Sequence, residues 1–304
     1  MRIIAEGPAA AHSGLSAAGE LPGTRRQAAP PTLPNVPGMK VALLVTCLAE
    51  AFAPQVADAA ARLVAAAAPD AEVVPVDRCC CGQPAWNAGY PGQARTMARG
   101  LLPRLRECDL VVVPSGSCAT MLLRYYPHLF AEGDPAGEAA RAVAAKTVEL
   151  TAFLAAHLPA DGAPPEGAAA PTGAGGAPSI AFHPSCHSLR GARVGDAGER
   201  CLRAAGCEVR QAGAADECCG FGGLFAVKED ALSVAMADRK LDGLLATGAP
   251  EVAAGELGCL MHLEGRAQRR GMSLRFRHVA EVLADANGRP AGPGGPAEPG
   301  RDAR

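Results

Sequence analysis

The sequence predicts an α/β protein made of two similar halves, each a parallel-sheet α/β domain with a cysteine site at the strand C-termini. Three observations lead to this prediction. Short apolar runs rich in β-branched residues alternate with helical patterns, an order typical of parallel sheets. A pattern of four cysteines occurs twice along the chain. A stretch composed almost entirely of proline, glycine, alanine and acidic residues separates the two occurrences, as a linker would.

The first half is expected to span residues 39–158. Its first predicted strand, residues 40–46 with the sequence KVALLVT, is a continuous apolar run typical of a buried parallel strand. Further strands are expected at residues 72–76 and 109–113. Helical patterns follow these strands in turn, and they cover residues 54–67, 91–106, a short segment ending near 125, and 133–157.

The second half is expected to span residues 179–286, after a linker at residues 159–178. Strands are expected at residues 179–182, 208–211, 251–254 and 274–276. Helices are expected around residues 196–205, at residues 229–245, in a segment after 256–259 that ends at residue 270, and at residues 278–284. Residues 1–38 and 287–304 lack apolar periodicity and are expected to be disordered tails.

The cysteine repeat defines the candidate site. Each half reads C-x(31–32)-C-C-G-x(35–38)-C. The positions are Cys47, Cys80, Cys81 and Cys118 in the first half, and Cys186, Cys218, Cys219 and Cys259 in the second. In each half these positions follow three successive strands, and sites in open α/β sheets form at the carboxyl ends of strands. Three loops from one sheet edge can therefore bring four thiols together.

Four thiols in one place indicate a metal centre, because thiolates bind zinc and iron–sulfur clusters. Zinc sites usually use C-x(2–4)-C pairs, whereas the side chains of adjacent cysteines diverge and suit a larger cluster better. Four thiolates are the usual complement for a cluster. We therefore expect two iron–sulfur clusters, with 4Fe–4S as one type that such a set can hold.

Other residues near the repeat are less clearly interpreted. Cys79 precedes the first pair and is either a further ligand or a core residue. Three cysteines outside the repeat are expected to be small buried hydrophobes, namely Cys108, Cys201 and Cys207. Three histidines flank Cys186 and Cys259, and they either contact the centre or pack in the core; they are His183, His187 and His262.

These motifs resemble the cysteine-rich CCG domain family, typified by the cysteine-rich subunit of heterodisulfide reductase and the glycolate oxidase iron–sulfur subunit. Within it they look most like the iron–sulfur proteins of lactate utilisation. The stretches that carry the resemblance include VTCLAEAFAPQV, CCGQPAWNAGY, PSGSCATM, HPSCH, CCGFGGLFAVK and GCLMHLEGR. The resemblance implies two α/β halves, each with an iron–sulfur centre, and zinc in one half is the alternative that it leaves open.

The sequence departs from the fullest form of the family pattern, which ends in C-x-x-C. The first cysteine of that pair is replaced by Ser115 in the first half and by Glu256 in the second. A four-thiolate cluster remains compatible with the sequence, whereas a cluster that needs five thiolates is in doubt. Glu256 is either an oxygen ligand or a polar loop residue.

Composition and missing motifs narrow the range of possible functions. The net charge of −2 gives no electrostatic footprint for nucleic acid, and no apolar run reaches the length of a membrane span. The first residues lack the apolar region of a secretory signal, so we expect a cytoplasmic protein. No ferredoxin cysteine run and no nucleotide-binding glycine motif is present. Electrons must therefore pass to or from other polypeptides, or the substrate must react at the centres themselves.

The resemblance implies one function, and the residues leave two alternatives. It implies an iron–sulfur subunit of an L-lactate oxidising complex of the L-lactate dehydrogenase type, inactive alone, with electron transfer to partner subunits that include a ferredoxin-type iron–sulfur protein. One alternative is a heterodisulfide or thiol reductase that acts at the cluster. The other is a zinc-stabilised interaction module without redox activity.

Overall fold

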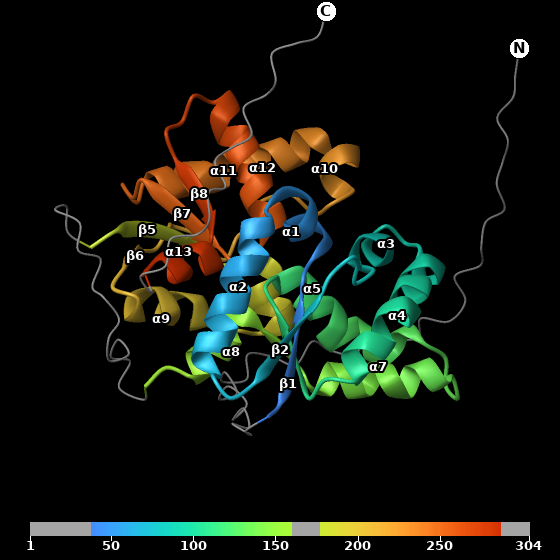
Figure 1. The fold of residues 1–304 in the computed structure, drawn as a ribbon. Helices are drawn as coiled ribbons and strands as arrows, with labels where there is room; N and C mark the ends of the chain where they lie inside the picture. The colour runs from blue at the N-terminus through green and yellow to red at the C-terminus, as the bar shows by residue number, and fades with distance from the viewer. Residues whose placement is uncertain (1–37, 160–176, 287–304) are drawn as a thin grey trace, which may run out of the picture.

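Two four-stranded parallel sheets form the framework of the molecule (Figure 1). The computed structural model describes residues 38–159 and 177–286, so both expected tails, residue 38 apart, and most of the expected linker lie outside the described residues. The first sheet has the order β2-β1-β3-β4 and the second the order β6-β5-β7-β8. The strands are β1 Lys40–Leu44, β2 Glu72–Val76, β3 Leu110–Val113, β4 Thr147–Glu149, β5 Ser179–His183, β6 Glu208–Arg210, β7 Glu251–Ala254 and β8 Arg275–His278.

The two sheets have the same topology, which confirms the predicted α/β class with two similar halves. In each sheet the first strand in the chain lies second in order, between the second and third strands. The helices of the first half are α1 Cys47–Phe52, α2 Pro54–Ala67, α3 Gln83–Asn87, α4 Pro91–Arg106, α5 Gly116–Thr120, the π-helix η1 Met121–Tyr125, α6 Tyr126–Leu129, α7 Pro135–Ala145 and α8 Leu150–Ala156. Those of the second half are the π-helix η2 His187–Ala192, α9 Ala197–Ala204, α10 Phe225–Lys228, α11 Asp230–Leu245, α12 Leu257–Arg269 and α13 Val279–Ala286.

The expected long helix over residues 133–157 is wrong. It is two helices, α7 and α8, separated by strand β4, which pairs in parallel with β3. The β-branched residues Thr147 and Val148 favour this extended segment. Glu149 then begins the next helix, because its side chain accepts hydrogen bonds from the backbone N–H groups of Thr151 and Ala152. Three residues are too few to show a period in the sequence.

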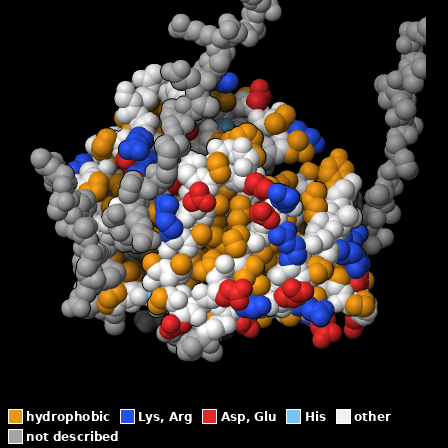
Figure 2. Space-filling model, in the orientation of Figure 1, with side chains coloured by type: hydrophobic (Ala, Val, Ile, Leu, Met, Phe, Trp, Pro, Cys, Tyr) orange, Lys and Arg blue, Asp and Glu red, His pale blue; other side chains and the backbone are white. Residues whose placement is uncertain are grey.

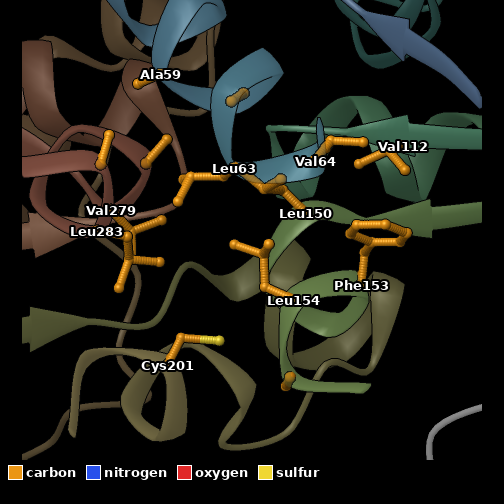
Figure 3. Close-up of a cluster of buried hydrophobic side chains, with 14 of the residues drawn as sticks. Ala59, Leu63, Val64, Val112, Leu150, Phe153, Leu154, Cys201, Val279 and Leu283 are labelled. Carbon is orange, nitrogen blue, oxygen red and sulfur yellow. The ribbon is translucent and has the colours of Figure 1, made fainter. Parts of the chain in front are cut away.

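The halves pack through one shared hydrophobic core (Figure 3). Helix α2 packs on α13, and α8 packs on α9. These two contacts are equivalent, because α2 and α9 occupy matching places in the two halves, as do α8 and α13. The side chains of Leu63, Leu150, Phe153 and Leu283 lie in this core. The repeated halves are therefore related by an approximate twofold axis.

The surface carries mixed charge, and Figure 2 shows acidic and basic side chains intermixed on one face. Of the five arginines in residues 266–277, four are paired with acidic neighbours, namely Arg266, Arg270, Arg275 and Arg277. Arg266 and Arg270, for example, both bind the carboxylate of Asp238. Within residues 38–159 and 177–286, none of the helices combines the length and the hydropathy needed to cross a bilayer.

Candidate metal centres

Three loops at the carboxyl edge of the first sheet carry the first four cysteines. Cys47 follows β1 and opens helix α1, which is capped by Thr46 through an Ala49 N–H bond of 3.3 Å. Cys80 and Cys81 follow β2. Cys118 lies in the first turn of α5, which follows β3. Thiols in the first turn of a helix meet free N–H groups, which favour a thiolate.

The four sulfurs of the first half form a connected group. The Cys47 thiol donates a hydrogen bond to Cys80, which also accepts one from Cys81. The Sγ atoms of Cys81 and Cys118 lie 3.3 Å apart. The bonds from Cys47 and Cys81 hold the pKa of Cys80 well below its usual range, and the bond to Cys80 together with burial raises the pKa of Cys47. These hydrogen bonds favour the thiolate form at Cys80 over the thiolate form at its neighbours.

The second half repeats this arrangement. Cys186 follows β5, the Cys218–Cys219 pair follows β6, and Cys259 lies in the first turn of α12. The Sγ atoms of Cys219 and Cys259 are 2.9 Å apart. Hydrogen bonds from Cys186 and Cys219 hold the pKa of Cys218 well below its usual range. The structure therefore brings the eight predicted residues together as two groups of four.

The glycine after each cysteine pair is required by the backbone. Gly82 and Gly220 have φ angles of +87° and +90°, a conformation that side chains rarely adopt. A Cβ at Gly220 would lie 2.6 Å from the Ser233 carbonyl oxygen, and one at Gly82 would lie 3.1 Å from that of Ala94. The glycines also point N–H groups at sulfur, at 3.5 Å from Cys80 and 3.4 Å from Cys218.

One cavity connects the two groups. It has a volume of about 620 Å³ and is lined by seven of the eight cysteines, all except Cys80. Apolar side chains form much of its wall, among them Leu48, Leu224 and Leu257. The cavity exists because the carboxyl edges of the two sheets face each other, with α1 packed beside α12 (Figure 1).

Ser115 of the first half and Glu256 of the second half form a hydrogen bond in the wall of the cavity. The Ser115 hydroxyl donates to Glu256 Oε2 at 3.0 Å, and the Ser117 N–H donates to the same oxygen at 2.8 Å. Both side chains are buried and both residues line the cavity. The Glu256 carboxylate therefore links the second half to the start of α5, a role that the sequence alone does not reveal.

A second buried carboxylate lies nearby, and sequence reasoning did not find it. Glu149 is 3% exposed, and its Oε2 accepts hydrogen bonds from the N–H and the hydroxyl of Thr151 at 2.7 and 2.5 Å. Burial raises the pKa of Glu149 to about 7, and the charge of Glu256 adds to this effect. The residue was not recognised because it fell inside the helix expected over residues 133–157.

Of the three flanking histidines, His183 lies deepest. It is 1% exposed, and burial lowers its pKa to about 3, so the ring is neutral. One of its ring nitrogens and the Sγ atoms of Cys219 and Cys259 all lie within 4.8 Å of one another. His187 Nδ1 lies 3.8 Å from Cys186 Sγ, and His262 Nε2 lies 3.3 Å from the Ser233 hydroxyl.

The remaining cysteines pack in the protein interior. Cys79 Sγ points at the Val76 carbonyl oxygen, 3.5 Å away, and burial raises its pKa to about 11. Cys108, Cys201 and Cys207 are buried in hydrophobic clusters, as expected for small apolar residues. Cys201 Sγ, for example, lies 3.6 Å from the Thr151 carbonyl oxygen.

Comparison with known proteins gives consistent matches over the folded part of the chain. Residues 41–123 and 180–264 each match the model of the cysteine-rich domain called CCG. The chain is similar to the lactate utilization protein A of Geobacillus kaustophilus, with 39% identity over 253 residues that cover 82% of this chain and all of that protein. The proteins of the same name from Bacillus cytotoxicus and Shouchella clausii are 35% and 36% identical, and each alignment covers 81% of this chain and 98% of the relative.

Proposed function

Because this chain belongs to the family of proteins with cysteine-rich CCG domains, and is a relative of the lactate utilization A proteins, we propose that it is the iron–sulfur subunit of an L-lactate oxidising complex. In this role it carries electrons through two CCG-type clusters. The relatives' names support the substrate, and the two cysteine groups support the cofactor.

The residues of each group fit an iron–sulfur cluster. Each half offers four sulfurs on converging loops, and all of these are partly to fully buried, as a protected cluster requires. The N–H groups of Gly82 and Gly220 are placed to hydrogen-bond cysteine sulfur. Such bonds stabilise negative charge on sulfur and tune a bound cluster. When bound, the clusters supply one-electron redox chemistry.

The observation that carries this proposal is the cavity shared by both cysteine groups. Its wall is largely apolar, and it reaches cysteines of both halves, so two centres held by these cysteines would border one common space. The chain has no recognisable nicotinamide or flavin motif. We therefore propose that lactate is oxidised with partner subunits, including a ferredoxin-type iron–sulfur protein, in the cytoplasm.

The test compares the isolated chain with the assembled complex. The chain is purified anaerobically, alone and with its partner subunits, and both are assayed for lactate oxidation with a dye acceptor. We expect turnover only in the complex, and loss of turnover with Cys47→Ser or Cys186→Ser while the subunits still co-purify. Robust lactate oxidation by the isolated chain contradicts the proposal, as does full activity of a complex that lacks these cysteines.

A second candidate function is reduction of a thiol or disulfide substrate at the cluster. The apolar cavity favours it, since a small ligand in that space would contact cysteines of both halves. Measuring disulfide reduction by the isolated, reduced protein separates it from the first proposal. A zinc-stabilised module without redox activity would instead contain zinc and neither iron nor acid-labile sulfide.

A further inference from the structure

The two halves differ at one buried position beside their centres. Leu44 is the last residue of β1 and lies three residues before Cys47; His183 is the last residue of β5 and lies three residues before Cys186. Both side chains are 1% exposed. The repeated fold thus places a leucine in the first half where it places an imidazole in the second.

The imidazole of His183 is buried beside the second cysteine group. Among the residues that the structure describes, neither Nδ1 nor Nε2 of His183 makes a hydrogen bond. Leaving a buried polar group without a hydrogen bond destabilises the folded state. The leucine in the first half shows that the fold accepts an apolar side chain here, so packing does not explain the histidine.

The position of His183 suits coordination. A ring nitrogen and the Sγ atoms of Cys219 and Cys259 lie within 4.8 Å of one another. Two ligands of one tetrahedral ion, with metal bonds of about 2.0–2.3 Å, lie roughly 3.5–3.8 Å apart. Small side-chain movements bring the three atoms to such distances. The other nearby candidates have partners, since His262 contacts Ser233 and His187 contacts Gln83.

We propose that His183 is a nitrogen ligand of the metal in the second half, which makes this centre a mixed sulfur–nitrogen site while the centre of the first half is bound by thiolates alone. The inference rests on the proposed function only in that the second cysteine group binds a metal. In this centre His183 takes the place of one of the four thiolates, and a neutral imidazole in place of a thiolate makes the centre less negative. In an iron–sulfur cluster this raises the reduction potential, and with a single ion the ligand set is Cys₃His, which is typical of zinc.

The test reads the ligand atoms directly, without an activity assay. The full-length protein is purified anaerobically with ¹⁵N-labelled histidine, and its iron, zinc and sulfide contents are measured. For an iron centre, pulsed electron paramagnetic resonance detects coupling to ¹⁵N; for zinc, X-ray absorption fine structure at the zinc edge resolves nitrogen from sulfur. We expect one histidine nitrogen per second-half centre. A ligand set of sulfur alone overturns the inference.

Variants then identify the histidine. His183→Leu introduces the residue found in the first half and is expected to abolish the nitrogen signal and to lower the metal content of the second half at least several-fold. His187→Gln and His262→Gln, the matched controls, are expected to retain the signal. If His183→Leu does not fold, signal retained in both controls supports the assignment, and signal lost in either one overturns it. A nitrogen signal that survives in folded His183→Leu also overturns it.

The outcome is distinguishable from failure of the proposed function. Metal-free wild-type protein overturns both proposals. A second centre bound by sulfur alone overturns only the role of His183. A nitrogen ligand in a protein whose complex does not oxidise lactate overturns only the lactate proposal.

Discussion

The Ser115 hydroxyl and the Glu256 carboxylate, 3.0 Å apart, join the two halves at equivalent positions. Each residue occupies the N-cap position of the helix that carries the last cysteine of its own half, Ser115 on α5 and Glu256 on α12, but only the Ser115 side chain caps its own helix. The fullest family pattern has cysteine at both of these positions. In this chain they hold a hydrogen-bonded pair that spans the approximate twofold axis. The Glu256 carboxylate also accepts a hydrogen bond from the Ser117 N–H.

Ser115→Ala is expected to lower the free energy of unfolding by about 1–3 kcal/mol, because the buried Glu256 carboxylate loses a donor and α5 loses its cap. Urea denaturation of the purified protein measures the change. Ser117→Ala provides the comparison, because it keeps the N–H bond to Glu256 and removes only the contact of its hydroxyl with that of Ser115, so a smaller loss is expected. An unchanged midpoint in Ser115→Ala would show that this link does not stabilise the protein.

The buried Glu149 is expected to make stability depend on pH. Its pKa is raised to about 7 from an ordinary 4.5, so the folded state holds a proton that the unfolded state has released between these values. Its contribution is therefore fully present below pH 4.5 and is lost as the pH rises to about 7, by up to about 3 kcal/mol.

Glu149→Gln isolates this contribution, since the amide oxygen can still cap α8 and cannot titrate. The difference in unfolding free energy between the wild type and the variant is measured from pH 4.5 to 8. The wild type should lose stability relative to Glu149→Gln as the pH rises. Glu132→Gln, at an exposed position, provides the control. A difference that stays constant with pH would refute the raised pKa.

Alanine at the motif glycines is expected to disrupt the centres unequally. In Gly220→Ala the new Cβ meets a backbone oxygen at 2.6 Å, so the loop that carries Cys218 must move; Gly82→Ala meets one at 3.1 Å and is milder. Both variants are also strained by a positive φ. Metal content and melting temperature measure the effect. The control is Gly100→Ala, at a position of helix α4 with open space around it, which should be neutral or should stabilise the protein by about 0.5–1 kcal/mol. Equal retention of metal in all three variants would contradict this account.

Much of the fold was predictable because its signals are local. Continuous apolar runs marked the inner strands, and the helix over residues 54–67 was predicted with the bounds that α2 has. Strand β4 was not predictable, since a three-residue strand becomes stable only by pairing with β3. The cysteine groups were predictable as well, because their spacing recurs and the carboxyl ends of parallel strands meet at one edge.

The rest of the site depends on how the halves pack, which sequence spacing does not encode. The Ser115–Glu256 bond joins residues 141 positions apart, and the shared cavity forms only where two sheet edges face each other. The burial of His183 could have been suspected from its alignment with Leu44, but its unpartnered nitrogens could not. These features arise from tertiary contacts.

The central claim, that each half binds an iron–sulfur cluster, is tested most directly by the iron and acid-labile sulfide content of anaerobically purified protein. The proteins compared are the wild type, Cys80→Ser, Cys219→Ser and the double variant. The control is Cys108→Ser, in the hydrophobic core. The account predicts that each single variant loses about one centre, that the double variant loses both together with the visible absorbance, and that Cys108→Ser retains its iron. Wild-type iron and absorbance in the double variant would contradict it.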